Sequence, residues 1–209
     1  MENLIELLKS FTEKDYAEKK VNLHIHTNLS DGEGDCKQII DSAKEKGYKL
    51  IAITDHNTVE AHKIIQDEIL LTGVEFDCWF GYVYIHLLAY GIDVNHPNLE
   101  PFYAKNHTDA SNMLPRFFAR RNVKKLIEAV HNAGGIAVLA HPACYWALSL
   151  NKLVKDLIKI GLDGIEVYYP YPRFRSVVKF HSSKKVRKIA KKYPQLIKTG
   201  GTDFHGKYF

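Results

Sequence analysis

The sequence is poor in cysteine and contains no long hydrophobic run. Cys36, Cys78 and Cys144 are its only cysteines; they lie far apart and form no Cys-x-x-Cys pair. This spacing argues against a disulfide framework and against a zinc site built from thiolates. Unpaired cysteines suit a reducing compartment, so we expect a cytoplasmic protein.

The N-terminal segment lacks the features of a targeting or membrane signal. Residues 1–20 have an acidic second residue and no uninterrupted apolar stretch. We therefore expect neither a secretory signal nor a membrane span. The spacing of Leu4, Leu8 and Phe11 instead predicts an amphipathic N-terminal helix over 1–20 that lies on the domain.

The bulk composition favours one domain over residues 1–209. Hydrophobic residues make up 45% of the chain, which is enough for a sizeable core, and the net charge is +5. A mild positive charge fits a small anionic substrate better than a long nucleic-acid footprint, so we expect no stable binding of duplex nucleic acid. Charge of this size is also common in lysine-rich soluble proteins and does not identify the ligand.

Short apolar runs alternate with helical patterns along the chain. The expected strands cover 21–27, 49–56, 74–80, 82–92, 136–142, 164–170 and 195–205. The expected helices cover 35–46, 59–71, 121–132, 153–161 and 176–192. This alternation predicts an α/β fold with parallel strands, and the number of units favours a closed barrel. We expect the strands 74–80 and 82–92 to pair as neighbours.

The regular pattern is lost between the strand 82–92 and the next helix. Residues 93–118 contain three of the seven prolines and many turn-forming residues. We interpret this segment as an irregular insertion.

The first strand contains two histidines in the sequence His24-Ile25-His26. Side chains two residues apart on a strand point to the same face, so both imidazoles can reach one metal ion. Asp31 follows in a glycine-rich loop that can fold back toward the strand end. A lone His-x-His pair also arises on half-exposed strands, so this motif alone does not establish a site.

Ligand-type side chains recur at the ends of the other expected strands. Asp55 and His56 follow an apolar run, where unpaired ionisable groups would be costly. The remaining positions are Glu75, His86, His141, Asp203 and His205. Any one of them could be an ordinary core or surface residue. Because functional residues of α/β barrels gather at the carboxyl ends of the strands, the whole set predicts a shared metal site.

The donor types indicate which ions and which chemistry this site would suit. Imidazoles with a few carboxylates and no thiolate suit Zn, Mn or Fe better than Mg or Ca. Ions bridged by one carboxylate can clamp the attacking and leaving oxygens of a phosphoryl displacement and activate a water near neutral pH. We expect Asp55 to shuttle a proton or to orient a histidine ligand, and Glu166 to be an outer carboxylate or an ordinary salt-bridge partner.

A substrate phosphate also requires cationic donors. Arg116, Arg120 and Arg121 follow the irregular segment, and Arg173 and Arg175 follow the strand 164–170. The guanidinium fork matches phosphate oxygens, so we expect one or two of these arginines to bind substrate.

The ordered motifs resemble those of the PHP (polymerase and histidinol phosphatase) superfamily. The segments that carry the resemblance are HIHTNLSDGE, ITDHNTV, GVEF, YIHLLAYGID, AVLAHP, GIEV and GGTDFHG. The resemblance spans about residues 21 to 206. It implies a distorted (β/α)7 barrel, TIM-like, with a trinuclear metal centre at the carboxyl ends of the strands.

By position, the resemblance also implies the ligands of each ion. One ion would be held by His24, His26, Glu75 and Asp203. Glu75 would bridge to a second ion held by His86 and His141. Asp31, His56 and His205 would hold the third. The expected catalytic residues are Asp55, His56, Glu75 and His205.

Within the superfamily, the chain is most similar to the stand-alone bacterial branch that acts on nucleoside 3',5'-bisphosphates and short 5'-phosphorylated RNA. That branch usually has a longer helical cap where this chain has residues 93–118. The expected function is therefore hydrolysis of a phosphate monoester or diester, with the nucleotide preference left open. The alternatives are a phosphatase for a small metabolite such as histidinol phosphate, a non-catalytic metal-stabilised module, and a metal-dependent deacylase.

Overall fold

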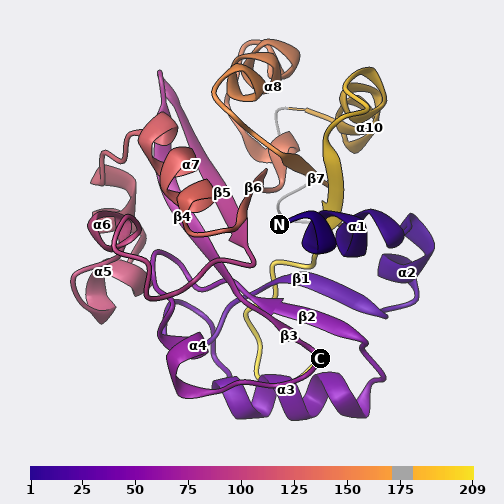
Figure 1. The fold of residues 1–209 in the computed structure, drawn as a ribbon, viewed down its shortest axis with the longest axis vertical. Helices are drawn as coiled ribbons and strands as arrows, with labels where there is room; N and C mark the ends of the chain where they lie inside the picture. The colour runs from indigo at the N-terminus through magenta and orange to yellow at the C-terminus, as the bar shows by residue number, and fades with distance from the viewer. Residues whose placement is uncertain (171–180) are drawn as a thin grey trace.

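The computed structural model describes residues 1–170 and 181–209, and in them the chain forms two sheets flanked by helices (Figure 1). The expected α/β class is confirmed. The first sheet is parallel and has the order β1-β2-β3. Its strands are β1 (Val21–Ile25), β2 (Leu50–Ile53) and β3 (Leu70–Leu71).

The second sheet has the order β4-β5-β6-β7-β8 and mixes both directions. Its strands are β4 (Gly73–Phe80), β5 (Val83–Tyr90), β6 (Ile136–Leu139), β7 (Gly164–Tyr168) and β8 (Ile197–Gly200). β4 and β5 are neighbours, as expected, but the pairs β4–β5 and β5–β6 are antiparallel. The prediction of parallel pairing throughout was wrong because a tight turn at Gly81, with φ 61°, joins β4 to β5 and leaves no room for a crossover.

The two sheets meet at two isolated bridges. Ile25, at the end of β1, pairs with Phe204 beyond β8, and His56, beyond β2, pairs with Glu75 on β4. Backbone hydrogen bonds of 2.8 Å, from His26 N to Phe204 O and from Asn57 N to Glu75 O, support these junctions. The described residues show no continuous closed ladder, so the closed barrel is not confirmed. The junctions place the carboxyl end of β1 beside the segment after β8, and that of β2 beside β4.

Helices cover the outer faces of the sheets (Figure 1). They are α3 (Cys36–Glu45), α4 (Glu60–Ile64), α7 (Val123–Asn132), α8 (Leu150–Lys159) and α10 (Ser183–Lys192). The expected helix 35–46 is confirmed as α3: Asp35 and Gln38 form a capping box at its start, and Gly47, with φ 76°, follows its end. The expected helix 176–192 is seen as α10, and residues 176–180 lie outside the described part.

Two helical predictions need correction. The expected helix 59–71 is only α4, because Leu70 and Leu71 pair with the open edge of β2 and form β3. Residues 1–20 form two helices, α1 (Glu2–Ser10) and α2 (Glu13–Ala17), because a new capping box starts at Thr12. No helix in the described ranges is long and apolar enough to cross a membrane.

The segment 93–118 contains short helical turns: η1 (Glu100–Phe102), α5 (His107–Ser111) and α6 (Met113–Phe118). One further turn, η2 (Pro142–Cys144), follows β6. α6 packs against β4 and lies beside the β4–β5 hairpin (Figure 1).

The space between the sheets is filled with apolar side chains at one end. Leu23 and Ala52 from the first sheet pack with Leu88 and Val138 from the second, and Leu8 of α1 joins this buried cluster. α1 therefore lies against the end where β1 and β2 begin. The opposite end, where β1 and β2 finish, is left for polar side chains.

Candidate metal centre

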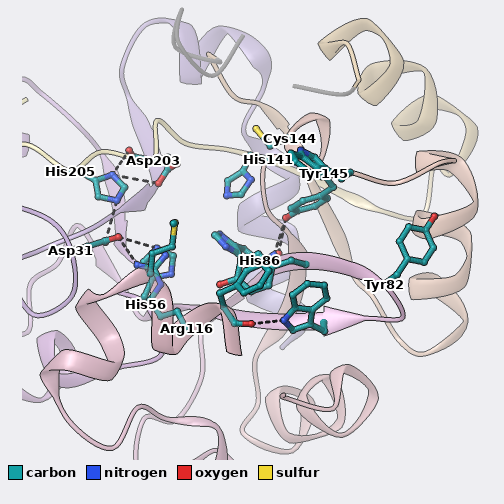
Figure 2. A pocket seen from close by; sticks show the side chains of 15 residues that line it. Asp31, His56, Tyr82, His86, Arg116, His141, Cys144, Tyr145, Asp203 and His205 are labelled. Atoms are coloured by element: carbon teal, nitrogen blue, oxygen red, sulfur yellow. Dashed lines mark hydrogen bonds and ion pairs between the residues drawn. The ribbon is translucent and has the colours of Figure 1, made fainter. Parts of the chain in front are cut away.

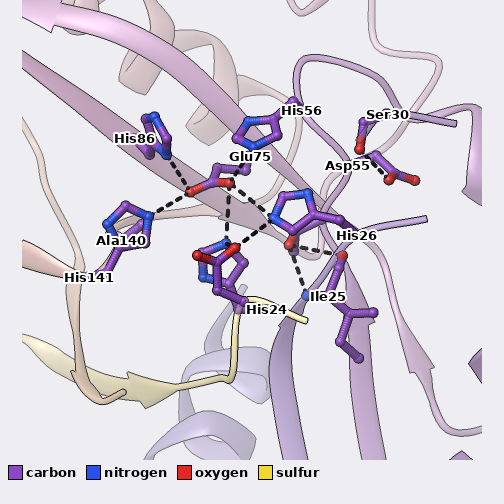
Figure 3. A network of polar contacts seen from close by, with 12 residues as sticks. His24, Ile25, His26, Ser30, Asp55, His56, Glu75, His86, Ala140 and His141 are labelled. Carbon is purple, nitrogen blue, oxygen red and sulfur yellow. Dashed lines mark hydrogen bonds and ion pairs between the residues drawn. The ribbon is translucent and has the colours of Figure 1, made fainter. Parts of the chain in front are cut away.

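The structure brings all nine predicted ligand side chains together at this polar end (Figures 2 and 3). They come from β1, β4, β5 and the segments that follow β1, β2, β6 and β8. The nine are His24, His26, Asp31, His56, Glu75, His86, His141, Asp203 and His205. Residues far apart in sequence meet here because the strand ends converge.

Glu75 lies at the centre of the cluster and is fully buried. Its Oε2 atom lies 3.2 Å from the Nε2 atoms of both His24 and His26, and 3.3 Å from Nε2 of His56 (Figure 3). Its other oxygen faces a second pair of rings. Oε1 lies 3.0 Å from Nδ1 of His86 and 3.2 Å from Nε2 of His141. Each oxygen of this one carboxylate thus serves a different group of imidazoles.

Two aspartates complete the arrangement. Asp203 Oδ1 lies 3.2 Å from Nε2 of His26 and 3.6 Å from Nε2 of His24. Asp31 Oδ1 lies 3.2 Å from Nε2 of His205, and its Oδ2 lies 3.6 Å from Nε2 of His56 (Figure 2).

These contacts define groups whose ligand atoms all lie within 4.8 Å of one another. Two groups contain the first and second ligand sets that the family resemblance implies. The third contains Asp31, His56 and His205 together with His26, which is shared with the first. These three groups overlap at His26 and Glu75, and a fourth group, His56, Asp77 and His86, shares His56 and His86 with them.

Several buried polar atoms of the cluster are left unsatisfied by the protein. Among the described residues, the cluster atoms with no hydrogen-bond partner are His24 Nε2, both ring nitrogens of His26, His56 Nδ1, Glu75 Oε2 and His141 Nδ1. Buried polar atoms are normally paired, because an unpaired one costs about 1–3 kcal/mol. Imidazole and carboxylate lone pairs aimed at common points fit divalent transition-metal ions. The donor set therefore fits the metal that its residue types predicted.

The charges within the cluster stabilise one another. Burial would raise the pKa of Glu75, but the surrounding imidazoles, His24 first, hold it well below its ordinary value. Burial would lower the pKa of His26, but the carboxylates of Asp203 and Glu75 raise it to about 9. Metal ligation requires neutral imidazoles, so binding of ions would release protons from these rings.

Glu166 supports two of the histidines. Its Oε1 lies 3.2 Å from Nδ1 of His24, and its Oε2 accepts a 2.6 Å hydrogen bond from the backbone N of His141. A carboxylate behind a ring fixes the tautomer and the direction of the opposite nitrogen. Of its two expected roles, the contacts favour that of an outer carboxylate.

Asp55 is buried, and its carboxylate binds the loop that follows β1. Its carboxylate accepts 2.7 Å hydrogen bonds from Thr27 N, Thr27 Oγ1 and Ser30 Oγ. Figure 3 shows Ser30 beside Asp55. It thus ties the end of β2 to the loop that carries Asp31, and these contacts include no histidine ring. Both expected roles of Asp55, shuttle and histidine orienter, are corrected to anchoring of this loop.

Asp77, which was not predicted as a site residue, lies fully buried beside the cluster. Its Oδ1 lies 3.2 Å from His86 Nε2, and its Oδ2 lies 3.4 Å from His56 Nδ1. A signal was present, because Glu75 and Asp77 are two residues apart on β4, just as His24 on β1 and His26 directly after it are two apart.

The predicted substrate arginines have different surroundings. Arg116 Nη1 lies 2.6 Å from Asp31 Oδ2, at the wall of the site. Arg121 donates to the carbonyl oxygens of Phe102 and Asp77 and so fastens backbone segments. The Arg120 guanidinium lies 4.7 Å from the ring centre of Trp79. Of the three, only Arg116 lines the cavity. Arg173 and Arg175 lie outside the described residues.

The cluster forms one wall of a cavity of about 640 Å³ (Figure 2). Asp31, His56, His86, His141, Asp203 and His205 line it on the polar side. The other lining residues are mostly aromatic or apolar and include Trp79, Tyr82, Tyr84, Phe117, Tyr145 and Trp146. The cavity thus combines a polar wall with large planar surfaces.

A site of this kind defines a metal-dependent hydrolase. Residues 22–201 match the PHP domain family, and because this match covers most of the chain, the chain belongs to the PHP family. It is accordingly a metal-dependent phosphoesterase.

Individual proteins that are similar to this chain have low sequence identity to it. The phosphoribosyl 1,2-cyclic phosphate 1,2-diphosphodiesterase of Eggerthella lenta is 24% identical, with 90% of this chain and 94% of that protein covered. The 5'-3' exoribonuclease Rnm of Escherichia coli K12 is 32% identical, with 68% of this chain and 55% of that protein covered. A solved structure of an amidohydrolase from Chromobacterium violaceum has a TM-score of 0.72 at 20% identity, covers 90% and 88% of the two chains, and shows a shared fold.

Proposed function

We propose that this phosphoesterase hydrolyses a phosphate monoester or diester of a nucleotide or short oligonucleotide with the help of two or three divalent ions. The observation that carries the proposal is the overlap of three ligand groups, through Glu75 and His26, at the wall of a cavity rich in aromatic side chains. Zn, Mn and Fe suit the donor set best.

In this proposal the chain holds each ion with a separate group of side chains. The first group is His24, His26, Glu75 and Asp203, the second is Glu75, His86 and His141, and the third is Asp31, His56 and His205. When bound, the ions supply an activated water and neutralise charge on the phosphate. The catalytic residues are then His56, Glu75 and His205.

Arg116 adds a fixed positive charge beside the ligands. It is nearly buried and held by Asp31 and Asp77, so its side chain keeps its position without substrate. With Nη1 and Nε held by the two aspartates, the Nη2 group is the part of the guanidinium that would donate to a phosphate oxygen. We therefore retain Arg116 as a substrate-binding residue and remove Arg120 and Arg121.

The aromatic side of the cavity favours a substrate with a planar base. Trp79, Tyr84 and Phe117 form a cluster with ring centres 4.9–5.3 Å apart, and Trp146 is 66% exposed in the same cavity. Bases stack on such rings, with about 1–3 kcal/mol gained for each base. The exoribonuclease named among the relatives is consistent with such a substrate.

The relative from Eggerthella lenta supports a second candidate, a cyclic phosphodiester of a sugar. The phosphate of such a substrate would lie at the polar wall of the cavity, but the substrate has no base to stack on the aromatic wall. The aromatic wall therefore makes it the weaker candidate.

We also propose that the chain is one PHP domain over 1–209 with a distorted seven-stranded barrel. The strands β1, β2 and β4–β8 would form the ring, and the two isolated bridges support its closure. Residues 93–118 would stand in place of a larger helical cap.

A substrate panel tests the proposed function. Purified protein loaded with Mn or Zn would be given adenosine 3',5'-bisphosphate, a short 5'-phosphorylated oligoribonucleotide, phosphoribosyl 1,2-cyclic phosphate, histidinol phosphate and an acetylated amide. We expect the highest kcat/KM for one of the first two. A higher value for the cyclic phosphate or histidinol phosphate, amide cleavage without phosphate release, or no turnover by fully loaded protein would refute it.

A further inference from the structure

Asp77 lies behind two of the proposed metal ligands, His56 and His86, and in the proposed function it serves only to hold Arg116. It follows Glu75 by two residues on β4, so both carboxylates point from the same face of the strand. In His56 and His86 it contacts only the ring nitrogen that faces away from Glu75. Its position is therefore suited to orienting ligands.

Each of the two histidines lies between these carboxylates. In His86, Nδ1 is 3.0 Å from Glu75 and Nε2 is 3.2 Å from Asp77. In His56 the order is reversed, with Nε2 3.3 Å from Glu75 and Nδ1 3.4 Å from Asp77. In both rings, Asp77 thus faces the nitrogen that points away from Glu75.

The remaining surroundings of Asp77 argue against an ion at this place. The Tyr84 hydroxyl donates a 2.6 Å hydrogen bond to Oδ1, and the Asn57 side-chain amide donates to Oδ2. The Arg116 Nε atom lies 3.2 Å from Oδ2 and brings a positive charge. Both oxygens of Asp77 are thus already engaged by side-chain donors, which leaves little capacity to hold a divalent ion between His56, Asp77 and His86. Protons on the two rings are the better partners.

We propose that Asp77 is a positioning residue shared by two ions: it accepts the Nε2 proton of His86 and the Nδ1 proton of His56. These tautomers leave the His86 Nδ1 and His56 Nε2 lone pairs for metal. His86 therefore binds its ion through Nδ1 and His56 binds its ion through Nε2. The inference rests on the ligand groups of the proposed function, but not on the identity of the substrate.

The wild-type protein tests this directly. Long-range ¹H–¹⁵N NMR spectra of the zinc-loaded chain show which ring nitrogen of each histidine carries a proton and which binds metal. We expect metal on Nδ1 of His86 and on Nε2 of His56. Metal on the opposite nitrogen of either ring would overturn the inference. Rings unchanged by zinc would overturn both the inference and the ligand assignment, whereas a failed substrate panel would leave these spectra unaffected.

A variant adds a quantitative test. Asp77→Asn keeps the shape of the side chain but places an amide among hydrogen-bond donors, so it can no longer serve both rings. Loss of such a carboxylate lowers metal affinity about 10–100-fold. We expect a loss of this size, measured by competition with a zinc chelator. Unchanged affinity would contradict the proposal.

The matched control is Asp163→Asn, which changes another histidine–aspartate pair outside the site. There His131 Nε2 lies 2.7 Å from Asp163 Oδ2. This control should retain wild-type zinc affinity, and an equal loss in both variants would also count against a specific role for Asp77. If Asp77→Asn fails to fold, the spectra of the wild-type chain still decide the question.

Discussion

At the scale of single residues, the site depends on side chains that belong to more than one ligand group. His26 is one of them: its Nε2 faces Glu75 and Asp203, and its Nδ1 lies 3.6 Å from Asp31. Loss of His26 should remove a ligand from the first ion and alter the surroundings of the third. Loss of a residue at the edge of the cluster should disturb one.

We expect His26→Ala to abolish most turnover and to lower the metal content of the purified protein. The activity should fall by more than about 100-fold, because a ligand contributes more than the outer contacts that orient it. Metal per chain can be counted by elemental analysis alongside the kinetics. His96→Ala, which alters a histidine away from the site, is the control. Wild-type metal content in His26→Ala would remove this residue from the centre.

Sequence patterns located most of these side chains because strand periodicity places residues i and i+2 on one face. That rule predicted that His24 and His26 can reach one ion, and the family resemblance predicted which residues hold each ion. The same rule applied to Glu75 and Asp77 would have found the missed aspartate. The role of Asp55 could not be predicted, because a carboxylate at a strand end can turn toward either the cluster or the neighbouring loop.

At the scale of elements, the β4–β5 hairpin links the metal ligands to the aromatic wall. Trp79 at the end of β4 donates a 2.7 Å hydrogen bond from Nε1 to the backbone oxygen of Phe117 on α6. Glu75 and His86 lie further along the same two strands. The hairpin therefore sets the distance between the phosphate site and the surface proposed for the base.

Trp79→Ala should weaken binding of nucleotide substrates while leaving the metal centre intact. We expect KM for adenosine 3',5'-bisphosphate to rise about 5–150-fold, as loss of about 1–3 kcal/mol of stacking implies, with a smaller change in kcat. A small phosphate ester without a base should be hydrolysed as by wild type. An equal effect on both substrates would argue against base stacking.

A second element-scale contact joins α7 to the turn before β7. The hydrogen bond to Asp163 raises the pKa of His131 above its ordinary value. A histidine with a raised pKa in the folded state stabilises the fold fully below its unfolded pKa, about 6.5, and less as pH rises through the folded value. His131→Gln should therefore lower Tm more at pH 6 than at pH 9. The reverse order, measured by thermal denaturation, would contradict this pairing.

Local rules predicted some elements and not others. The start of α3 was predictable, because Asp35 and Gln38 carry their own capping signal. β3 was not, since Leu70 and Leu71 sit in a helical pattern and become a strand only by pairing with β2. The antiparallel pairing of β5 with β6 likewise depends on partners distant in sequence.

At the scale of the whole molecule, the two ends of the space between the sheets have different roles. Apolar side chains and α1 fill one end of the space between the sheets, and nine ligand-type side chains occupy the other. Alternation of strands and helices predicted the α/β class. It could not predict that the sheets meet at isolated bridges, because closure depends on packing between strands far apart in the chain.

Removal and return of metal tests the central claim most directly. Protein treated with a strong chelator and dialysed should release no phosphate from a nucleotide substrate, and added Mn or Zn should restore activity as two or three ions bind each chain. Full activity in chelator-treated protein shown to be free of metal would contradict the account.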